Sequence, residues 1–380
     1  MSVSNISEPV RSLLWARSAG RCEFDGCNEP LWRDGLTQLE MNFADVAHII
    51  GDQEHGPRGD ALLSKAYCND ANNLMLMCPK HHRMIDRITK TYSVEVLREM
   101  KRAHEARIER LTNIKSDKTS HVIIYRCCVG EFQPKIDFRD ALVAMFPKRY
   151  PADPLPIDLG FSNSRFEDNE ELFWKVEVTN LKRNFTEKVK PYLQSDKERN
   201  HLSIFAFAPQ PLLITLGSYL SDLFPADVYQ LHREPATWEW QPGPEAFEYV
   251  IRKPDTDHPN VAIKLSLSAT IDSRRVAPIF GDQPYSEWEV TIIHPNNDYL
   301  KSKGQLQLFR QQFRSLLNRI KAKHGEQSVI HLFPAVPVSV AVEIGRVWQP
   351  KADLPFVIYD QNRKTGGFTP VLTIGEVSHD

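Results

Sequence analysis

Apolar side chains recur along this chain with two different periods, and these periods predict where helices and strands lie. Residues 93–111 have apolar positions at helical spacing and basic residues on the opposite face. Residues 9–19 predict a short helix, because Pro9 suits a first helical turn and Gly20 suits its end. Residues 39–50 predict a strand with His48 near its end, whereas residues 51–60 are polar and glycine-rich, which is typical of a loop. We therefore expect the first hundred residues to form a small mixed unit of helices and strands.

The pattern changes after the polar stretch 112–120, where we expect a boundary between domains at residues 1–115 and 116–380. Beyond it, short apolar runs alternate with helical stretches, which is typical of α/β layers around a largely parallel sheet. The runs expected as strands are 121–129, 172–178, 202–208, 261–267, 288–293, 329–333 and 355–359. The stretches expected as helices are 212–223, 306–323 and 338–348.

Two segments of the second part are built alike. Residues 203–214 and 329–340 each contain an apolar run, a proline-bounded turn and the start of a helical stretch. Such a repeat predicts a duplicated, pseudo-symmetric domain.

Composition and charge narrow the class of protein. A chain of 380 residues is too long for one small core, and its 25% charged and 41% hydrophobic residues are ordinary for a globular protein. The formal net charge of −2 excludes a chain that binds nucleic acid over its whole surface, although ten Lys or Arg residues against five acids lie between Lys80 and Lys115. We find no signal peptide and no apolar run of membrane-spanning length, so we expect a cytoplasmic protein without a membrane partner.

Three of the six cysteines have metal-ligand spacing. Cys22 and Cys27 form one close pair, and Cys78 forms another with His81. Zinc prefers four nitrogen or sulfur ligands, and two such pairs leave no open position, so we predict a structural Zn²⁺. Three buried cysteines and a surface histidine are the alternative, which fits the spacing less well. The remaining cysteines are expected to be small buried hydrophobic residues: Cys68, Cys127 and Cys128.

Two histidines are left over beside this cluster, His48 and His82, with His55 as a weaker third candidate. A neutral imidazole can take a proton from water while a divalent metal stabilises charge on a phosphate. A lone histidine at a strand end is usually structural, but the place of His48 between the two zinc pairs favours it as the base. Asn73 can orient His48 or the neighbouring loop through side-chain hydrogen bonds.

The order Cys-x4-Cys, Ala-His-Ile, Asn-Leu and Cys-x2-His-His-x3-Asp resembles the HNH (ββα-metal) endonuclease family over roughly residues 10–110. The resemblance implies that His48 is the general base, Asn73 the middle residue and His82 a ligand of a catalytic Mg²⁺ or another divalent metal. It also implies double-stranded DNA as substrate. The basic face of the helix expected at 93–111 can bind along the phosphates of the DNA, or it can simply be a solvated helix face.

One position departs from this family. Many members carry Asp or His directly before the base as a second metal ligand, and this chain has Ala47 there. Asp45 shares a strand face with Ala47 and is one candidate substitute. Asp86 is another acidic neighbour.

Residues 121–380 contain no comparable catalytic cluster, but their topology predicts a binding region. Ligands of parallel α/β sheets bind beyond the carboxyl ends of the strands, where helix N-termini can offer N–H groups to phosphates. Prolines that merely end strands are the alternative at each turn. The candidate ligand-binding residues in these turns are Pro209, Gln210, Ser268, Thr270, Pro334 and Ala335.

Segments 331–346 and 355–360 resemble the carboxy-terminal signature of the SAVED domain, and segment 202–212 with Trp238-Glu239-Trp240 agrees with it. SAVED domains resemble two fused CARF-like, Rossmann-like units and bind cyclic oligonucleotide second messengers. The expected fold class is therefore mixed α/β. It combines a small zinc-stapled ββα-metal (HNH) nuclease domain with a larger duplicated Rossmann-like SAVED domain.

An HNH nuclease fused to SAVED resembles an effector of CBASS, a bacterial anti-phage system. The resemblance implies a cyclic di- or trinucleotide as activator and self-association, from dimer to tetramer or higher, on activation. Such a ligand needs cations for its phosphates and aromatic rings for its bases. For each candidate a surface charge or core packing is the alternative: Arg126, Lys175, Arg233 and Arg346 for phosphates, and Trp174, Tyr219 and Phe333 for bases.

Two other functions stay open at this point. The first domain can be a zinc-stapled DNA-binding module without catalysis, joined to a ligand sensor, which Ala47 before the base leaves open. The chain can also be a modification-dependent restriction endonuclease whose second domain reads modified bases.

Overall fold

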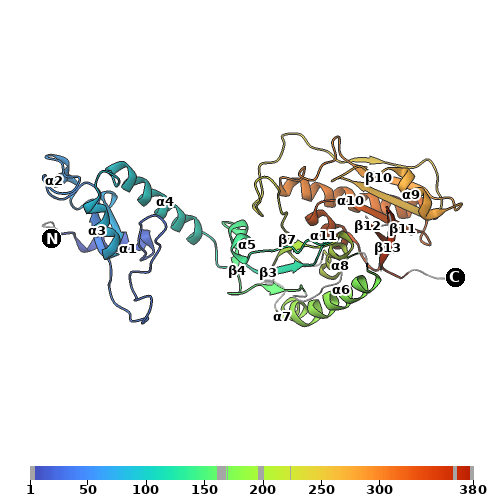
Figure 1. Ribbon diagram of the computed structural model, residues 1–380, viewed down its shortest axis with the longest axis horizontal. Helices are drawn as coiled ribbons and strands as arrows, with labels where there is room; N and C mark the ends of the chain where they lie inside the picture. Colours follow the sequence, from blue (N-terminus) through green and yellow to red (C-terminus); the bar gives the residue numbers. More distant parts are fainter. Residues whose placement is uncertain are drawn as a thin grey trace. The chain divides into compact units, whose positions relative to one another are not determined.

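The computed structural model describes residues 5–160, 168, 170–195, 201–222, 224–362 and 366–376. The chain divides into two compact units, Met1–Lys115 and Ser116–Asp380 (Figure 1). No helix among the described residues has both the length and the apolar character that crossing a bilayer requires.

The first unit is built on a short antiparallel hairpin. Strands β1 (Asp45–His48) and β2 (Leu74–Met77) pair so that Asp45 lies opposite Met77 and His48 opposite Leu74. Buried apolar side chains of the hairpin pack with α3 and α4 into a core that includes Ala47, Met75 and Leu97. The helices of this unit are α1 (Glu8–Ser18), α2 (Leu63–Tyr67), η1 (Ala71–Asn73), α3 (Pro79–Arg87) and α4 (Val94–Thr112).

The two helices predicted in this unit are confirmed as α1 and α4. The strand predicted over residues 39–50 is shorter, because only Asp45–His48 pairs with β2. The residues before it form a loop that is closed by an isolated bridge between Arg33 and Glu40.

Two sheets of like topology form the second unit. The first is parallel, with the order β4-β3-β6-β7 and β5 beside β3. The second has the order β13-β12-β11-β9-β10-β8, with a parallel centre and antiparallel edges at β13 and β8. Strands of the first sheet are β3 (Thr119–Arg126), β4 (Tyr150–Pro151), β5 (Ile157–Asp158), β6 (Leu202–Phe207) and β7 (Ala226–Val228). Strands of the second are β8 (Val250–Arg252), β9 (Asn260–Ser266), β10 (Ser286–Thr291), β11 (Val329–Ala335), β12 (Phe356–Asn362) and β13 (Gly367–Ile374).

Helices repeat in the same order in both halves. β3 is followed by α5, α6, β6, α8 and β7, and β9 by α9, β10, α10, β11, α11 and β12. The predicted duplication is thus confirmed. The helices are α5 (Phe138–Met145), α6 (Glu171–Asn184), η2 (Phe185–Val189), α7 (Lys190–Ser195), α8 (Gln210–Leu220), α9 (Ser273–Phe280), α10 (Lys303–His324) and α11 (Val338–Val347).

Helices α8 and α11 join the two halves. Each contacts strands of the other half, α8 with β12 and β13, and α11 with β6 and β7 (Figure 1). The helices approach closely at two glycines: a Cβ on Gly217 would lie 2.0 Å from the carbonyl oxygen of Val342, and one on Gly345 would lie 1.9 Å from that of Ile214. Only glycine allows this reciprocal contact.

One expected strand is wrong. Residues 172–178 belong to helix α6, because the buried positions Phe173, Trp174, Glu177 and Leu181 recur at helical spacing. The helix predicted at 212–223 begins earlier, as α8, and its last predicted residue, Leu223, lies outside the described residues.

Candidate functional site

Four metal-ligand side chains of the first unit converge on one point. Cys22 and Cys27 bound the turn that follows α1, in which Gly26 has a left-handed φ of +76°. Cys78 directly precedes α3, and His81 lies in its first turn. The ligand atoms of all four lie within 4.8 Å of one another, and within the described part of the chain no other set of three or more such residues meets this spacing.

This donor set fits zinc. His81 Nδ1 lies 3.2 Å from Cys78 Sγ and 3.7 Å from Cys22 Sγ, separations that a tetrahedral ion with bonds of about 2.0–2.3 Å can span. Burial raises the pKa of the Cys22 thiol well above its ordinary value, so a thiolate there needs a neighbouring cation. Phe24 stacks on the His81 ring at 4.2 Å between ring centroids and fixes its orientation. The structure thus brings the four predicted ligands together in one cluster that could hold a metal ion.

A second polar group lies beside this site on α3. His82 Nδ1 is 3.1 Å from Asp45 Oδ2 on β1, and His82 Nε2 is 3.4 Å from Asp86 Oδ2, one helical turn away. The three side chains are 29–42% exposed, so solvent reaches them. Ala47 itself is fully buried in the core. Both acidic substitutes that the sequence offers for a ligand at Ala47 therefore flank His82, and either carboxylate can share a divalent cation with it.

His48 closes β1, and its ring contacts a backbone carbonyl. Its Nε2 lies 3.0 Å from the carbonyl oxygen of Cys68. Because a carbonyl only accepts, Nε2 carries the proton in this hydrogen bond, and Nδ1 keeps a lone pair. That tautomer suits a general base.

Asn73 fastens the backbone that follows His48. Its Oδ1 accepts from the Ile50 N–H at 2.9 Å, and its Nδ2 donates to the carbonyls of Ile50 at 3.0 Å and Tyr67 at 3.2 Å. Orientation of this loop is one of the two roles that the sequence predicts for Asn73. His55 is exposed in the same loop.

The basic helix α4 is less positive at its surface than its sequence indicates. Lys101 is buried, with Nζ 2.6 Å from a Glu105 carboxylate oxygen and 3.8 Å from one of Glu23. His104 is also buried and lies 3.1 Å from the carbonyl oxygen of Ser18. Both side chains therefore hold α4 to the unit and are not available to phosphates.

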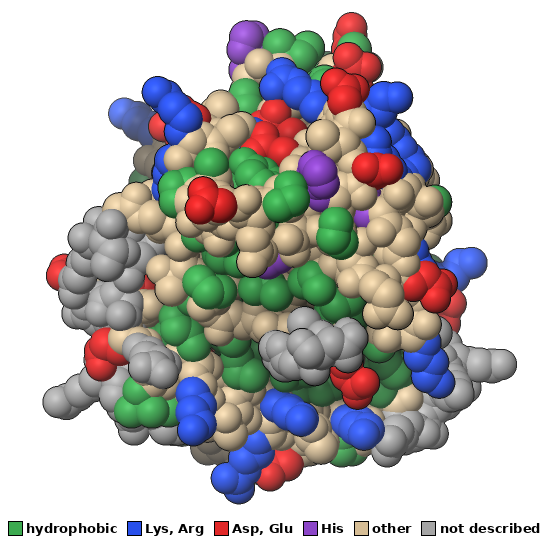
Figure 2. All heavy atoms as spheres, turned by 90° about the vertical axis from the view of Figure 1, so that its right-hand side faces the viewer, with side chains coloured by type: hydrophobic (Ala, Val, Ile, Leu, Met, Phe, Trp, Pro, Cys, Tyr) green, Lys and Arg blue, Asp and Glu red, His purple; other side chains and the backbone are tan. Residues whose placement is uncertain are grey.

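The second unit contains a cavity of about 710 Å³ at the carboxyl ends of its strands. Its wall comes from the segments that follow β3, β6, β9 and β11 and from the end of β12, which is where ligands of parallel sheets bind. Figure 2 looks onto the side towards which β3 points in Figure 1, and hydrophobic side chains lie across the middle of that face with Lys and Arg towards its lower edge. The polar wall residues are Glu131, Asp168, Gln210, Gln230, Arg233, Ser268, Asn297, Asp360 and Gln361.

Helices α8 and α11 both begin at this cavity. Their N-cap residues, Pro209 and Pro337, line the wall, and neither cap has a side-chain hydrogen bond to the first turn. The positive ends of two helix dipoles therefore face one cavity from pseudo-equivalent positions.

Two glutamines connect the halves at this cavity. Gln210 on α8 accepts a hydrogen bond from the Val336 N–H at 3.2 Å. Gln230, which follows β7, accepts from the N–H of Ser339 at 3.3 Å and from its hydroxyl at 2.8 Å. Each bond runs from the first half to the start of α11, so the helix N-termini have fixed positions.

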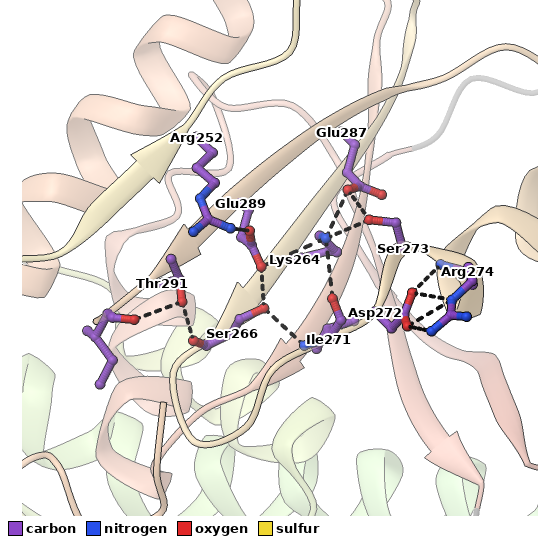
Figure 3. Close-up of polar contacts among 11 residues, drawn as sticks. Arg252, Lys264, Ser266, Ile271, Asp272, Ser273, Arg274, Glu287, Glu289 and Thr291 are labelled. Carbon is purple, nitrogen blue, oxygen red and sulfur yellow. Dashed lines mark hydrogen bonds and ion pairs between the residues drawn. The ribbon is translucent and has the colours of Figure 1, made fainter. Parts of the chain in front are cut away.

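A buried polar network fixes the loop that carries Ser268 (Figure 3). Lys264, on β9, donates to the carbonyl oxygen of Ile271 at 3.3 Å. Ser266 Oγ accepts from the Ile271 N–H at 3.2 Å and donates to Glu289 at 2.7 Å. The loop between Ser266 and Ile271 is thus closed at both ends, which holds Ser268 in the cavity wall.

Three of the predicted ligand-binding residues line the cavity, Pro209, Gln210 and Ser268, together with the phosphate candidate Arg233. Arg346 does not. It is buried on α11 and donates to Glu343 Oε1 at 2.7 Å and to the carbonyl oxygen of Phe224 at 3.0 Å.

The remaining candidates also lie outside the cavity wall. Arg126 pairs with Asp158 at 3.0 Å. Trp174 is buried, and Phe333 is fully buried and stacks on Tyr359 at 4.5 Å, so the core-packing alternative describes both. The other residues outside the wall are Thr270, Pro334, Ala335, Lys175 and Tyr219.

Sequence reasoning missed the acidic side chains of the wall and its amide side chains other than Gln210. Gln230 follows β7, a three-residue strand that is too short to give an apolar pattern. The sequence could have indicated Asp360 as a candidate, because it directly follows the apolar run 355–359 and therefore lies near the carboxyl end of a strand. Burial, together with the negative charge of Asp168, raises the pKa of Asp360 to about 7.

Comparison with protein families assigns both units. Residues 182–374 match the family model of the SMODS-associated and fused to various effectors sensor domain, SAVED. Residues 22–89 match the model of an HNH endonuclease. No curated protein sequence matches this chain.

Solved structures give weaker similarity. The Acinetobacter baumannii Cap4 SAVED/CARF-domain containing receptor with the cyclic trinucleotide 2'3'3'-cAAA aligns at 12% identity and a TM-score of 0.43, over 78% of this chain and 62% of that chain. The same receptor with 3'3'3'-cAAA aligns at 12% identity and a TM-score of 0.41, over 77% and 60%. This chain therefore spans less than two thirds of the length of these receptors.

Proposed function

The chain belongs to the SAVED sensor-domain family and carries an HNH endonuclease region, and we propose that it is a cyclic-oligonucleotide-activated, metal-dependent endonuclease. Its substrate is double-stranded DNA and its role is that of a CBASS-like anti-phage effector. The observation that carries the proposal is the cavity at which α8 and α11 both begin. It lies at the junction of two like halves, on the same chain as a nuclease region.

The messenger is a cyclic di- or trinucleotide bound in this cavity. Its phosphates carry negative charge, and the positive ends of the α8 and α11 dipoles stabilise such charge. Arg233 is the cationic side chain of the cavity wall, and Phe132 offers an exposed ring for a base. The carboxylates and amides of the wall accept hydrogen bonds from the amino groups of bases.

Nuclease chemistry is assigned to His48, which is buried at the end of β1, and to the partly exposed group of His82, Asp45 and Asp86. His48 Nδ1 takes a proton from the attacking water, because its Nε2 proton is held by the Cys68 carbonyl. His82 with Asp45 or Asp86 would hold a divalent cation such as Mg²⁺, whose chemistry there is to neutralise phosphate charge. Cys22, Cys27, Cys78 and His81 would hold Zn²⁺, which staples a unit too small to bury a large core.

Activation requires that the messenger bind the active assembly more tightly than the resting one. We expect self-association from dimer to tetramer or higher to supply the active assembly, which can place nuclease sites on both strands of a duplex. A messenger with equal affinity for both states would leave the nuclease inactive.

The test uses the purified full chain, supercoiled plasmid, Mg²⁺ and a panel of synthetic cyclic di- and trinucleotides. We expect one class of messenger to trigger nicking and degradation, and omission of either the messenger or Mg²⁺ to abolish it. Plasmid that is shifted on a gel but never cut would identify a DNA-binding module instead. Cutting that depends on methylated DNA, without any messenger, would identify a modification-dependent enzyme.

A further inference from the structure

The loop between β1 and α2 buries an arginine beside the proposed nuclease centre. The Arg58 side chain is only 4% exposed, although the surrounding segment 51–60 is polar. Its φ is +56°, a left-handed value that non-glycine residues rarely adopt. A buried guanidinium is costly unless its donors are satisfied, and strained backbone often marks a functional constraint.

Every nitrogen of the Arg58 guanidinium has a partner, and the partners belong to two elements. Nε donates to the carbonyl oxygen of Ile49 at 2.8 Å, and Nη1 to that of Ile85 at 2.6 Å. Nη2 donates both to the carbonyl oxygen of His48 at 3.2 Å and to Asp86 Oδ1 at 2.8 Å. His48 and Ile49 stand at the end of β1, whereas Ile85 and Asp86 stand near the end of α3.

The loop is shaped for this contact by two close approaches. A Cβ on Gly51 would lie 2.3 Å from the carbonyl oxygen of Pro57, and one on Gly59 would lie 2.2 Å from that of Gln53. Only glycine fits at both positions, so the chain can fold back on itself and direct Arg58 inward. The Gly51 N–H also donates to the Arg58 carbonyl at 3.3 Å, which closes the loop on the arginine.

The two parts of the proposed centre leave β1 on different sides. Alternate residues of a strand point to opposite faces, so Asp45, the partner of His82, and His48 project from opposite faces of β1. Arg58 ties the end of β1 to α3, because one of its nitrogen atoms donates both to the His48 carbonyl and to the Asp86 carboxylate.

We propose that Arg58 is a positioning residue of the nuclease, which fixes the proposed base His48 relative to the cation-binding side chains of α3. This inference rests on the proposed function. Arg58 touches neither DNA nor water in this role; it sets the geometry in which His48 and the α3 carboxylate meet the same phosphate. It also holds one oxygen of Asp86, so that the other, which faces His82, is the one presented to a cation.

The test compares Arg58→Lys and Arg58→Ala with wild type in the full chain, with Arg11→Ala as matched control. Arg11 also donates to one backbone carbonyl of the same unit, that of Ile6 at 3.2 Å, but it lies on α1 and not in the loop after β1. At saturating messenger and DNA we expect Arg58→Lys to lower kcat at least tenfold with little change in KM, because lysine cannot reach four acceptors at once. Arg11→Ala should cleave as wild type does.

Two further readouts separate positioning from mere stability. Binding of Mn²⁺, followed by electron paramagnetic resonance, should weaken several-fold in Arg58→Ala relative to wild type, and His82→Ala should remove this binding. Added guanidinium at millimolar concentration should restore part of the cleavage by Arg58→Ala, since it can refill the vacated site. A loss of stability alone would not be rescued in this way.

The outcomes are distinct. If Arg58→Lys cleaves at the wild-type rate, or if Arg58→Ala loses activity only through unfolding and without guanidinium rescue, the positioning role is overturned. If wild type itself never cuts DNA with any messenger, the proposed function fails first, and this role fails with it. Mn²⁺ binding that is unchanged in Arg58→Ala would overturn the part of the inference that concerns Asp86.

Discussion

At the scale of single residues, Asp360 gives the cavity a titratable wall. Burial and the charge of Asp168 raise its pKa to about 7, and Glu131 and Arg233 are the other charged side chains of the same wall. Phosphates of a messenger add negative charge to this cavity and therefore favour the protonated carboxyl. Messenger binding and proton uptake by Asp360 are thus coupled.

The first prediction concerns this coupling. We expect messenger affinity to fall several-fold as pH rises from about 6 to 8, because Asp360 ionises across its raised pKa in that window. Asp360→Asn, which is always neutral, should bind with nearly constant affinity over the same range. Calorimetric titration at each pH measures this, with the exposed Asp282→Asn as a charge-matched control. Wild-type affinity that is flat from pH 6 to 8 would contradict the assignment.

The second prediction at this scale concerns Asp45 and Asp86. Both carboxylates lie within 3.4 Å of His82, so both are candidates for the ligand that Ala47 does not provide. Asp86 is also held by Arg58, whereas Asp45 projects from β1 without that constraint. We expect Asp86→Asn to lower the cleavage rate and to raise the Mg²⁺ concentration for half-maximal cleavage by about tenfold. If Asp86→Asn and Asp45→Asn each leave the Mg²⁺ requirement unchanged, neither carboxylate is a ligand.

At the scale of elements, the contact between α8 and α11 sets the cavity. Gly217 and Gly345 let the helices cross with backbone in contact, and their N-termini then meet at one place. A methyl group at either position must push the helices apart, because the nearest atoms belong to backbone. The helix pair is therefore a structural link between messenger binding and the arrangement of the two halves.

The third prediction tests this link. Gly217→Ala should lower the free energy of unfolding of the second unit by about 1–3 kcal/mol, as overpacking does, and weaken messenger binding at least tenfold. Gly304→Ala is the matched control, since Gly304 also lies in a helix but a Cβ there meets its nearest atom at an ordinary 3.7 Å. Denaturant melts and calorimetry provide the measurements. Equal stability and affinity of the two variants would contradict the close-packing account.

The fourth prediction concerns the cluster of Cys22, Cys27, Cys78 and His81. Cys22→Ser should remove one ligand from a closed four-ligand set and unfold the first unit, whereas the second unit should still bind messenger. Cys68→Ser is the control, because Cys68 is partly exposed and lies outside the cluster. Thermal melts with and without a zinc chelator separate the cases. A Cys22→Ser chain as stable as its parent would refute a structural metal.

The apolar pattern of the sequence predicted helices and strands that bury one face. It missed elements whose form depends on contacts with distant parts of the chain. Helix α4 follows from its apolar spacing, α1 from Pro9 at its start and Gly20 after its end, and the duplication from two proline-bounded turns. Segment 172–178 looks like a strand because its apolar residues are consecutive, and only its burial against the core shows the helical period. Strand β7 is too short to carry any pattern.

The candidate sites were predictable to different degrees for the same reason. Metal ligands are recognisable from spacing alone, since one ion requires particular residue types close together. Cavity residues carry no such signature, and Arg346 shows the consequence: this candidate phosphate partner lies in the last turn of α11 as a buried link to Glu343. The role of Arg58 could not be predicted from the sequence, because it depends on a loop that folds back and brings the guanidinium to the His48 carbonyl.

At the scale of the whole molecule, the proposed function has cleavage by the nuclease region wait for a signal that the sensor on the same chain receives. Helices α8 and α11 contact strands of both halves, so a ligand at their N-termini acts on the arrangement of the entire sensor. Differential binding to two assemblies can then change the population of active nuclease.

The measurement that tests this account most directly is the rate of plasmid cleavage as a function of messenger concentration, with Mg²⁺ present, for wild type and His48→Ala. We predict that the wild-type rate rises at least a hundredfold from zero to saturating messenger. His48→Ala should bind the messenger and self-associate as wild type does, yet cut at least a thousandfold more slowly. A wild-type rate that is the same with and without messenger, or full cutting by His48→Ala, would contradict it.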